Sequence, residues 1–136
     1  ALILAAAGLE RLGLQDAPRV PIPAAILLPA PGQGALGLEI RADDARTRRS
    51  LAPLDDPASA AQVTAERAVL AALEGGCQVP VAAYARSPRL YGRVTALDGT
   101  IQLTASAELD ARDPAAAGAA VAALLRAQGA PRLLGR

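Results

Sequence analysis

Hydrophobic residues recur at helical spacing in two stretches of the second half of the chain. The first stretch begins at Asp56-Pro57 and ends at Gly75, and the second begins at Asp113-Pro114 and ends near Gly129. Aspartate followed by proline is typical of a helix start, because the carboxylate caps free backbone N–H groups and proline fits the first turn. We therefore predict a helix over each stretch. The apolar positions on these helices are Val63, Leu70, Leu73, Val121, Leu124 and Leu125.

Three segments that favour strands lie between the two predicted helices, over residues 79–86, 89–97 and 100–108. Asp98-Gly99 separates the last two segments and predicts a tight hairpin turn. The order helix, three strands, helix is typical of an α+β unit. We expect a three-stranded antiparallel sheet packed by helices.

Residues 1–55 carry weaker patterns, interrupted by prolines that cannot continue a helix. Pro53 to Asp56 is the best candidate for a linker to the second half. The elements expected before it are a helix over residues 1–12 with Gly13 just past its end, a strand-like run at residues 26–28, a segment at 35–41 whose second half alternates like a strand, and a short helix from Asp43 or Asp44 to about Leu51.

The amino-acid composition excludes several kinds of catalytic, metal-binding and cross-linking sites. The chain of 136 residues has no His and one Cys, which excludes an imidazole base, a His zinc ligand and an internal disulfide, and we expect no metal site. All 14 basic residues are Arg, whose planar forks suit carboxylate or phosphate, but a net charge of +1 argues against a nucleic-acid surface. No segment is long enough to span a membrane, and we expect a cytoplasmic protein.

A glycine motif is the first candidate for a binding site. Gly32-x-Gly34-x-x-Gly37 matches the dinucleotide-binding fingerprint, which requires a helix directly after the glycines so that its N-terminal amides face the phosphates. Leu38 and Ile40 instead continue the pattern as a strand. A glycine-rich hinge is the favoured interpretation, and a nucleotide-binding module is the alternative.

A cysteine loop is the second candidate. Cys77 stands in the segment Glu74-Gly75-Gly76-Cys77-Gln78-Val79-Pro80, after a helix end and before a strand. A single Cys is more often a small buried hydrophobe. Two preceding glycines, however, allow a loop to project the thiol into a cleft, as a nucleophile or as the anchor of a covalent group. Without His, arginines or backbone amides would have to favour the thiolate.

Three blocks follow one another along the chain: AGLERLG at residues 7–13, LPAPGQGA at 28–35, and Glu66-Arg67 followed by EGGCQVP at 74–80. In this order they resemble the C-terminal part of the porphobilinogen deaminase family, also called hydroxymethylbilane synthases. The resemblance implies a transferase of tetrapyrrole biosynthesis, the route to haem, chlorophyll and corrins. Such enzymes deaminate four porphobilinogen molecules and join them head to tail into hydroxymethylbilane, on a dipyrromethane primer linked to a cysteine.

The resemblance implies roles for six residues. Cys77 would hold the dipyrromethane cofactor through a thioether, in a loop with Gly75 and Gly76. Gln33 and Gly34 would lie beside the cofactor and the growing oligopyrrole. Arg11 would bind a carboxylate of the substrate.

The resemblance also implies how the chain divides. Residues 1–28 would end the family's domain two, residues 29–55 would be a hinge and return segment to domain one, and residues 56–136 would be the C-terminal cofactor-carrying domain. Partial α/β segments would thus precede the α+β unit.

The family's catalytic Asp belongs to the N-terminal half, so we expect no catalytic residue in this chain and no activity from it alone. The expected partners are porphobilinogen, the growing oligopyrrole and the missing N-terminal portion of the same enzyme, which would be monomeric when complete. A non-catalytic interaction domain is the remaining alternative.

Overall fold

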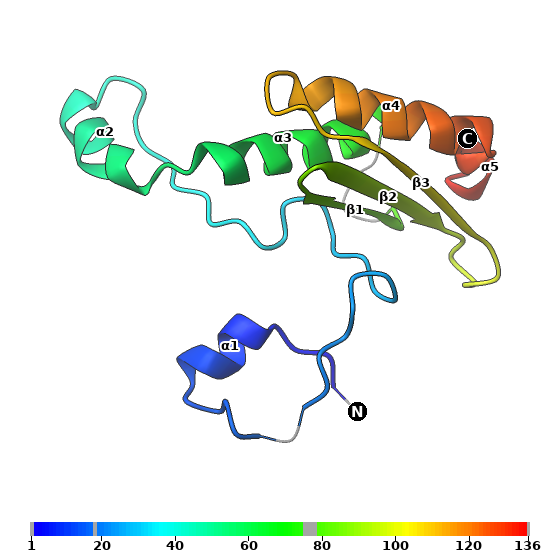
Figure 1. Ribbon diagram of the computed structural model, residues 1–136, viewed down its shortest axis with the longest axis horizontal. Helices are drawn as coiled ribbons and strands as arrows, with labels where there is room; N and C mark the ends of the chain where they lie inside the picture. Colours follow the sequence, from blue (N-terminus) through cyan, green and yellow to red (C-terminus); the bar gives the residue numbers. More distant parts are fainter. Residues whose placement is uncertain (1, 18, 75–78, 136) are drawn as a thin grey trace.

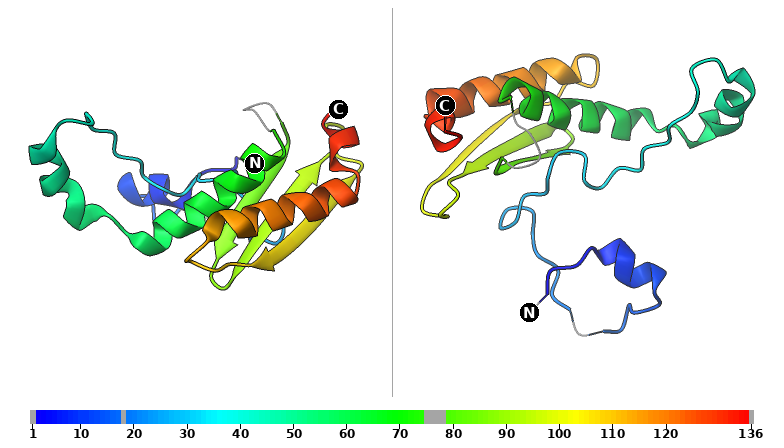
Figure 2. Two further views of the ribbon diagram at one scale, coloured as in Figure 1. Left: turned by 90° about the horizontal axis from the view of Figure 1, so that it is seen from above. Right: turned by 180° about the vertical axis from the view of Figure 1, so that it is seen from behind.

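The computed structural model describes residues 2–17, 19–74 and 79–135. Its second half is an α+β unit with an antiparallel sheet in the order β1-β2-β3, covered on one face by α3 and α4 (Figures 1 and 2). This arrangement confirms the fold class predicted from the sequence. The elements are α1 (Ala6–Arg11), α2 (Ala45–Leu51), the 3-10 turn η1 (Ala52–Leu54), α3 (Pro57–Ala72), β1 (Val81–Arg86), β2 (Arg89–Thr95), β3 (Gln102–Glu108), α4 (Pro114–Ala127) and α5 (Ala130–Leu133).

Both predicted Asp-Pro helix starts are confirmed. The Asp56 carboxylate accepts hydrogen bonds from the Ser59 hydroxyl at 2.8 Å and the Ala58 N–H at 3.0 Å, and these bonds hold the pKa of Asp56 below its ordinary value. Asp113 caps α4 by accepting from the Ala116 N–H. Helix α4 ends two residues before Gly129, whose φ of 98° turns the chain into α5, an element that the pattern did not predict.

The three strands pair as predicted, each a little shorter than its hydrophobic pattern. β2 is central, with Ala83 opposite Gly92 on one side and Gly92 opposite Ala105 on the other. The hairpin between β2 and β3 is confirmed, but its ends are joined by the Ala96 N–H donating to the Ile101 carbonyl, so the loop is longer than two residues. Gly99 supplies the left-handed position in that loop, with φ of 74°.

The core lies between the sheet and the two long helices (Figure 2). Alternate strand residues face the helices, as the period of two requires. Leu124 is 48% exposed, so the prediction that it lines the apolar side of α4 is wrong; Val121 and Leu125 fill that side. The largest fully buried side chains are Leu90, Leu125, Val69, Val94 and Val121.

Two glycines let the layers approach closely. A Cβ on Gly92 would lie 2.4 Å from Cγ1 of Val121, so β2 passes directly beneath α4. A Cβ on Gly118 would lie 2.4 Å from the Ala68 Cβ and 2.6 Å from the Ala65 carbonyl oxygen. The Ala65 carbonyl oxygen belongs to the backbone of α3 and cannot move aside as a flexible side chain could. The short distance between α3 and α4 therefore requires a residue without a side chain at Gly118.

The N-terminal part differs most from its prediction. Helix α1 covers only residues 6–11 of the expected 1–12, although Gly13 follows it with the expected positive φ of 70°. Residues 26–28 and 35–41 form no strand, so these two local strand predictions are wrong. The reason is physical: a strand needs a neighbour for its backbone groups, and these runs have none here. Helix α2 is confirmed, capped by Asp44.

α1 buries none of its residues and lies away from the sheet in Figure 1. Large apolar side chains are exposed through much of this part, among them Leu2, Ile3, Val20, Ile26 and Leu36. None of the helices that the structure describes is long and apolar enough to cross a membrane.

We predict that Gly118→Ala destabilises the protein even though alanine favours helices over glycine by about 1 kcal/mol. The added methyl would collide with α3, and overpacking of this kind costs about 1–3 kcal/mol. Urea unfolding measures the change. Gly8→Ala is the matched control, because the added methyl meets nothing within 4 Å. A higher unfolding midpoint for Gly118→Ala would contradict the packing described for α3 and α4.

Candidate functional site

The predicted cofactor loop connects α3 to β1. Gly75, Gly76 and Cys77 lie outside the described residues, but the structure fixes where the chain leaves and returns. α3 ends at Ala72, Leu73 packs into the core, and Glu74 takes the left-handed conformation, with φ of 52°. Such a residue turns the chain off the helix axis, a position that glycine usually occupies. The described elements on either side of the loop are therefore α3 and β1 of the C-terminal unit.

Glu66 on α3 connects two distant segments to this unit. Its side chain is buried, at 8% exposure, on the same helix face as Val69 and Leu73. One carboxylate oxygen accepts the Gly32 N–H at 2.7 Å, and the other accepts the Ala85 N–H at 2.7 Å. A buried carboxylate is tolerated only when such donors replace water. Glu66 therefore joins the glycine motif, α3 and β1 at one point.

The chain segment around the glycine motif also covers the open edge of β1. The Ala83 N–H, two residues before Ala85 on that edge, donates to the Pro29 carbonyl at 3.1 Å. Alternate residues of an edge strand point their N–H groups outward, so these two donors would otherwise need water or another strand. The Pro29 carbonyl accepts the Ala83 N–H, and the Glu66 carboxylate accepts the Ala85 N–H.

The glycine motif forms a tight turn. Gly32 has φ of 71°, and the Gln33 side-chain oxygen accepts the Ala30 N–H at 3.0 Å, which braces the turn from within. A Cβ on Gly34 would meet nothing within 4 Å, so the chain is open to its surroundings at that residue. The described residues after the motif up to Asp43 form no helix, so the turn lacks the helix N-terminus that a dinucleotide site requires.

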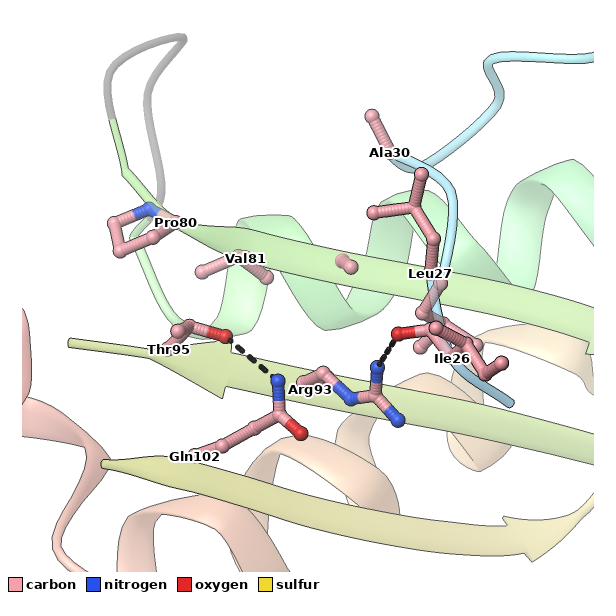
Figure 3. A pocket seen from close by; sticks show the side chains of 10 residues that line it. Ile26, Leu27, Ala30, Pro80, Val81, Arg93, Thr95 and Gln102 are labelled. Atoms are coloured by element: carbon pink, nitrogen blue, oxygen red, sulfur yellow. Dashed lines mark hydrogen bonds between the residues drawn. The ribbon is translucent and has the colours of Figure 1, made fainter. Parts of the chain in front are cut away.

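Arg93 holds the segment that precedes the glycine motif against the outer face of the sheet. Its guanidinium donates to the carbonyls of Ala25 at 2.9 Å and Ile26 at 3.0 Å, while its Nε is buried without a hydrogen-bond partner. Figure 3 shows the bond from Arg93 to the Ile26 carbonyl beside a shallow pocket of about 280 Å³ that Pro80, Thr95 and other residues line. The planar fork suits two adjacent carbonyls, so the arginine fixes this stretch of irregular backbone.

A broad hollow of about 1620 Å³ lies between the N-terminal segment and the C-terminal unit. Gln33 and Gly34 line it, so the structure brings these two predicted residues to one cavity. Arg11, exposed at the end of α1, is not among the residues that line it. The charged residues along the walls are Glu10, Arg19, Glu66 and Arg86.

Within residues 2–17, 19–74 and 79–135, no three acidic or cysteine side chains come together in a way that could hold a metal ion. The roles given to Arg11, Gln33, Gly34, Gly75, Gly76 and Cys77 stay predictions.

Comparisons with known proteins agree on one family. Residues 60–127 match the family model described as porphobilinogen deaminase, C-terminal domain, and residues 1–49 match the porphobilinogen deaminase, dipyromethane cofactor binding domain. The chain belongs to the porphobilinogen deaminase family. The two matches follow each other in the order that the three sequence blocks implied.

Curated members of this family cover nearly the whole chain. The porphobilinogen deaminase of Moorella thermoacetica is 50% identical over 98% of this chain and 44% of its own length. That of Roseiflexus castenholzii is 47% identical over 98% of this chain and 45% of its own length. The chain thus spans less than half the length of the porphobilinogen deaminases that it matches. The division at residues 28 and 55 stays a prediction.

Sequence reasoning missed the two residues that organise this region. Glu66 was noted only as part of a family block, yet it stands three residues before Val69 and seven before Leu73, on the buried stripe of α3. A charged residue on such a stripe indicates a specific partner. For Arg93 the alternation of β2 shows only that it faces away from the core, and no local signal reveals its two carbonyl partners.

We predict that Arg93→Met frees the segment around Ile26. Methionine keeps much of the apolar stem but donates no hydrogen bond, and each lost bond is worth about 0.5–1.5 kcal/mol. The amides of Ile26 and Leu27, which donate to the Pro23 carbonyl, should exchange with solvent about tenfold faster or more.

Arg89→Met is the matched control, because Arg89 lies on the same sheet face but donates to the Ser106 hydroxyl. Equal exchange of the Ile26 amide in both variants would show that Arg93 does not hold this segment.

Proposed function

We propose that this chain is the cofactor-carrying part of a hydroxymethylbilane synthase, which joins four porphobilinogen molecules into a linear tetrapyrrole. The observation that carries the proposal is the pair of family matches, one to a C-terminal domain and one to a cofactor-binding domain. The chain covers 44% of the length of the Moorella thermoacetica relative, so we assign the activity to the whole enzyme and the cofactor-carrying part to this chain.

Cys77 is the proposed attachment site. Its thiolate would attack the aminomethyl carbon of a porphobilinogen, a carbon–sulfur bond would form, and ammonia would leave with the thiol proton. The step balances without an oxidant, and it needs a reduced thiol, in keeping with a cytoplasmic location. When bound, a dipyrromethane supplies the free pyrrole carbon onto which further units are added.

The described residues suit such a group. Small-molecule sites are commonly about 300–1,000 Å³, so a hollow of about 1620 Å³ leaves room for a dipyrromethane and a growing chain. Gln33 and Gly34 on its wall support the positions that the resemblance gives them. Arg19 and Arg86 on the same wall offer guanidinium forks to acetate and propionate groups.

Arg11 remains the proposed ligand of a substrate carboxylate. It is the last residue of α1 and fully available to solvent-borne groups, since α1 buries none of its residues. In this arrangement Arg11 does not line the hollow. Its α1 neighbours Leu9 and Glu10 do line the hollow, which supports a place for Arg11 near the substrate.

The proposed macromolecular partner is the rest of the same enzyme. The exposed apolar side chains between Leu2 and Leu38 would cost free energy in water, at about 25 cal/mol per Å² of surface left unburied. They cluster in the part that contributes almost nothing to the core. The portion of the relatives that this chain does not span is the surface expected to cover them, within a monomeric enzyme.

We predict a covalent adduct on Cys77 when the chain is joined to the part of the Moorella thermoacetica relative that it does not span. Intact mass should rise by two porphobilinogen units less two molecules of ammonia, because each coupling releases one. Cys77→Ser should show no such increase, since serine is a far weaker nucleophile at neutral pH. The same adduct on Cys77→Ser would contradict the assignment.

We also predict that this chain alone forms no hydroxymethylbilane from porphobilinogen, whereas the joined protein does. The reason is that the family's catalytic Asp belongs to the N-terminal half. A discontinuous assay of the tetrapyrrole product, run on both proteins at equal concentration, measures the difference. Robust product from the chain alone would mean that its own carboxylates suffice.

A further inference from the structure

Glu66 stands apart from the other acidic residues that the structure describes, because it is buried. Both of its oxygens bind backbone N–H groups, one 34 residues earlier in the chain and one 19 residues later. A carboxylate that accepts two amide hydrogens in this way fixes the distance between them. Gly32 and Ala85 are therefore held on either side of the Glu66 carboxylate.

The two bonded partners differ in how firmly the rest of the structure holds them. Ala85 sits within β1 and pairs with Leu90 of β2, so the sheet fixes it with or without Glu66. Gly32 belongs to an irregular turn, and a second hydrogen bond, from the Ala83 N–H to the Pro29 carbonyl, joins the segment before it to the sheet. Loss of the carboxylate would therefore release the turn and leave the strand in place.

The turn leads to the hollow, and the strand follows the predicted attachment loop in the sequence. Gln33 and Gly34 follow Gly32 directly and line the hollow. β1 begins three residues after the predicted cofactor loop, 75–78. The Glu66 carboxylate thus joins the wall of the hollow to the strand that follows the attachment loop.

We propose that Glu66 is a positioning residue of the enzyme. Its carboxylate sets the glycine turn against β1, and so fixes Gln33 and Gly34 at the wall of the hollow. This role rests on the proposed function, whereas the hydrogen bonds that support it do not. No other described side chain bridges these two segments through both of its oxygens.

The first test concerns the hydrogen bonds in the chain itself. Glu66→Gln keeps the size of the side chain but leaves one oxygen to serve two donors, because the amide nitrogen cannot accept. We expect the amides of Gly32, Gln33 and Ala35 to exchange at least about tenfold faster, while β1 amides paired with β2 keep their protection. Unchanged exchange in the turn would overturn the proposal.

Glu39→Gln is the matched control, since Glu39 is exposed in the same segment and undergoes the same loss of charge. If Glu66→Gln fails to fold, an NMR measurement on the unaltered chain tests the same hydrogen bond. Scalar coupling across the hydrogen bond should connect the Gly32 nitrogen to the Glu66 carboxylate carbon. Absence of that coupling would also overturn the proposal.

The second test concerns the reaction and uses the chain joined to the unspanned part of the Moorella thermoacetica relative. We expect Glu66→Gln to acquire the same Cys77 adduct as the parent, with a KM for porphobilinogen within about twofold and a kcat lowered about tenfold or more. Misplacement of a binding wall by about 1 Å can reduce a rate by that much without blocking binding. Glu66→Asp, which keeps the charge but is shorter, should recover part of the kcat.

The outcomes separate the two proposals. A parent protein with neither adduct nor activity would remove the proposed function and the positioning role together. An active parent with an unchanged kcat in Glu66→Gln would remove the positioning role alone. A fall in kcat matched by loss of folded protein, with no recovery in Glu66→Asp, would assign Glu66 to stability and overturn the proposal.

Discussion

The open edge of β1 is the constraint on which the arrangement of this protein depends. The N–H groups of Ala83 and Ala85 point away from the sheet, and an edge strand with free donors invites another chain to pair with it. The Pro29 carbonyl takes one donor and the Glu66 carboxylate takes the other. Because Glu66 also binds Gly32, closing the edge brings the glycine turn to the sheet. One requirement of backbone chemistry thus connects two distant parts of the sequence.

A core made largely of alanine, valine and leucine makes close approach necessary. Small side chains bury little area each, so the layers must come near enough for every methyl group to have partners. Gly92 lets α4 rest on β2, and Gly118 lets α4 rest on α3. Glycine inside a strand or helix lowers the stability of that element, and at Gly92 and Gly118 this cost accompanies the closest contacts between the layers.

The part of the fold that sequence patterns predicted is the part whose signals are local. Asp56 and Asp113 cap the helices that begin next to them, and alternation marks strands whose partners are the next strands along the chain. The expected strands at residues 26–28 and 35–41 failed because a strand is a property of a pair. The Glu66 and Arg93 contacts reach across 34 and 67 residues, which no window of sequence can reveal.

The same reasoning explains why the candidate site is only partly formed. Gln33 and Gly34 reach the hollow because Glu66 and Pro29 tie their turn to the sheet, whereas Arg11 lies on a helix that buries none of its residues. Gln33 and Gly34 therefore line the hollow, and Arg11 does not, because only the glycine turn, among the described segments, is bonded to the C-terminal unit in this way. A segment rich in exposed leucine and isoleucine has no stable place until another apolar surface covers it. The position of Arg11 relative to the cofactor would then be set by that surface, while the position of Gln33 is set by this chain.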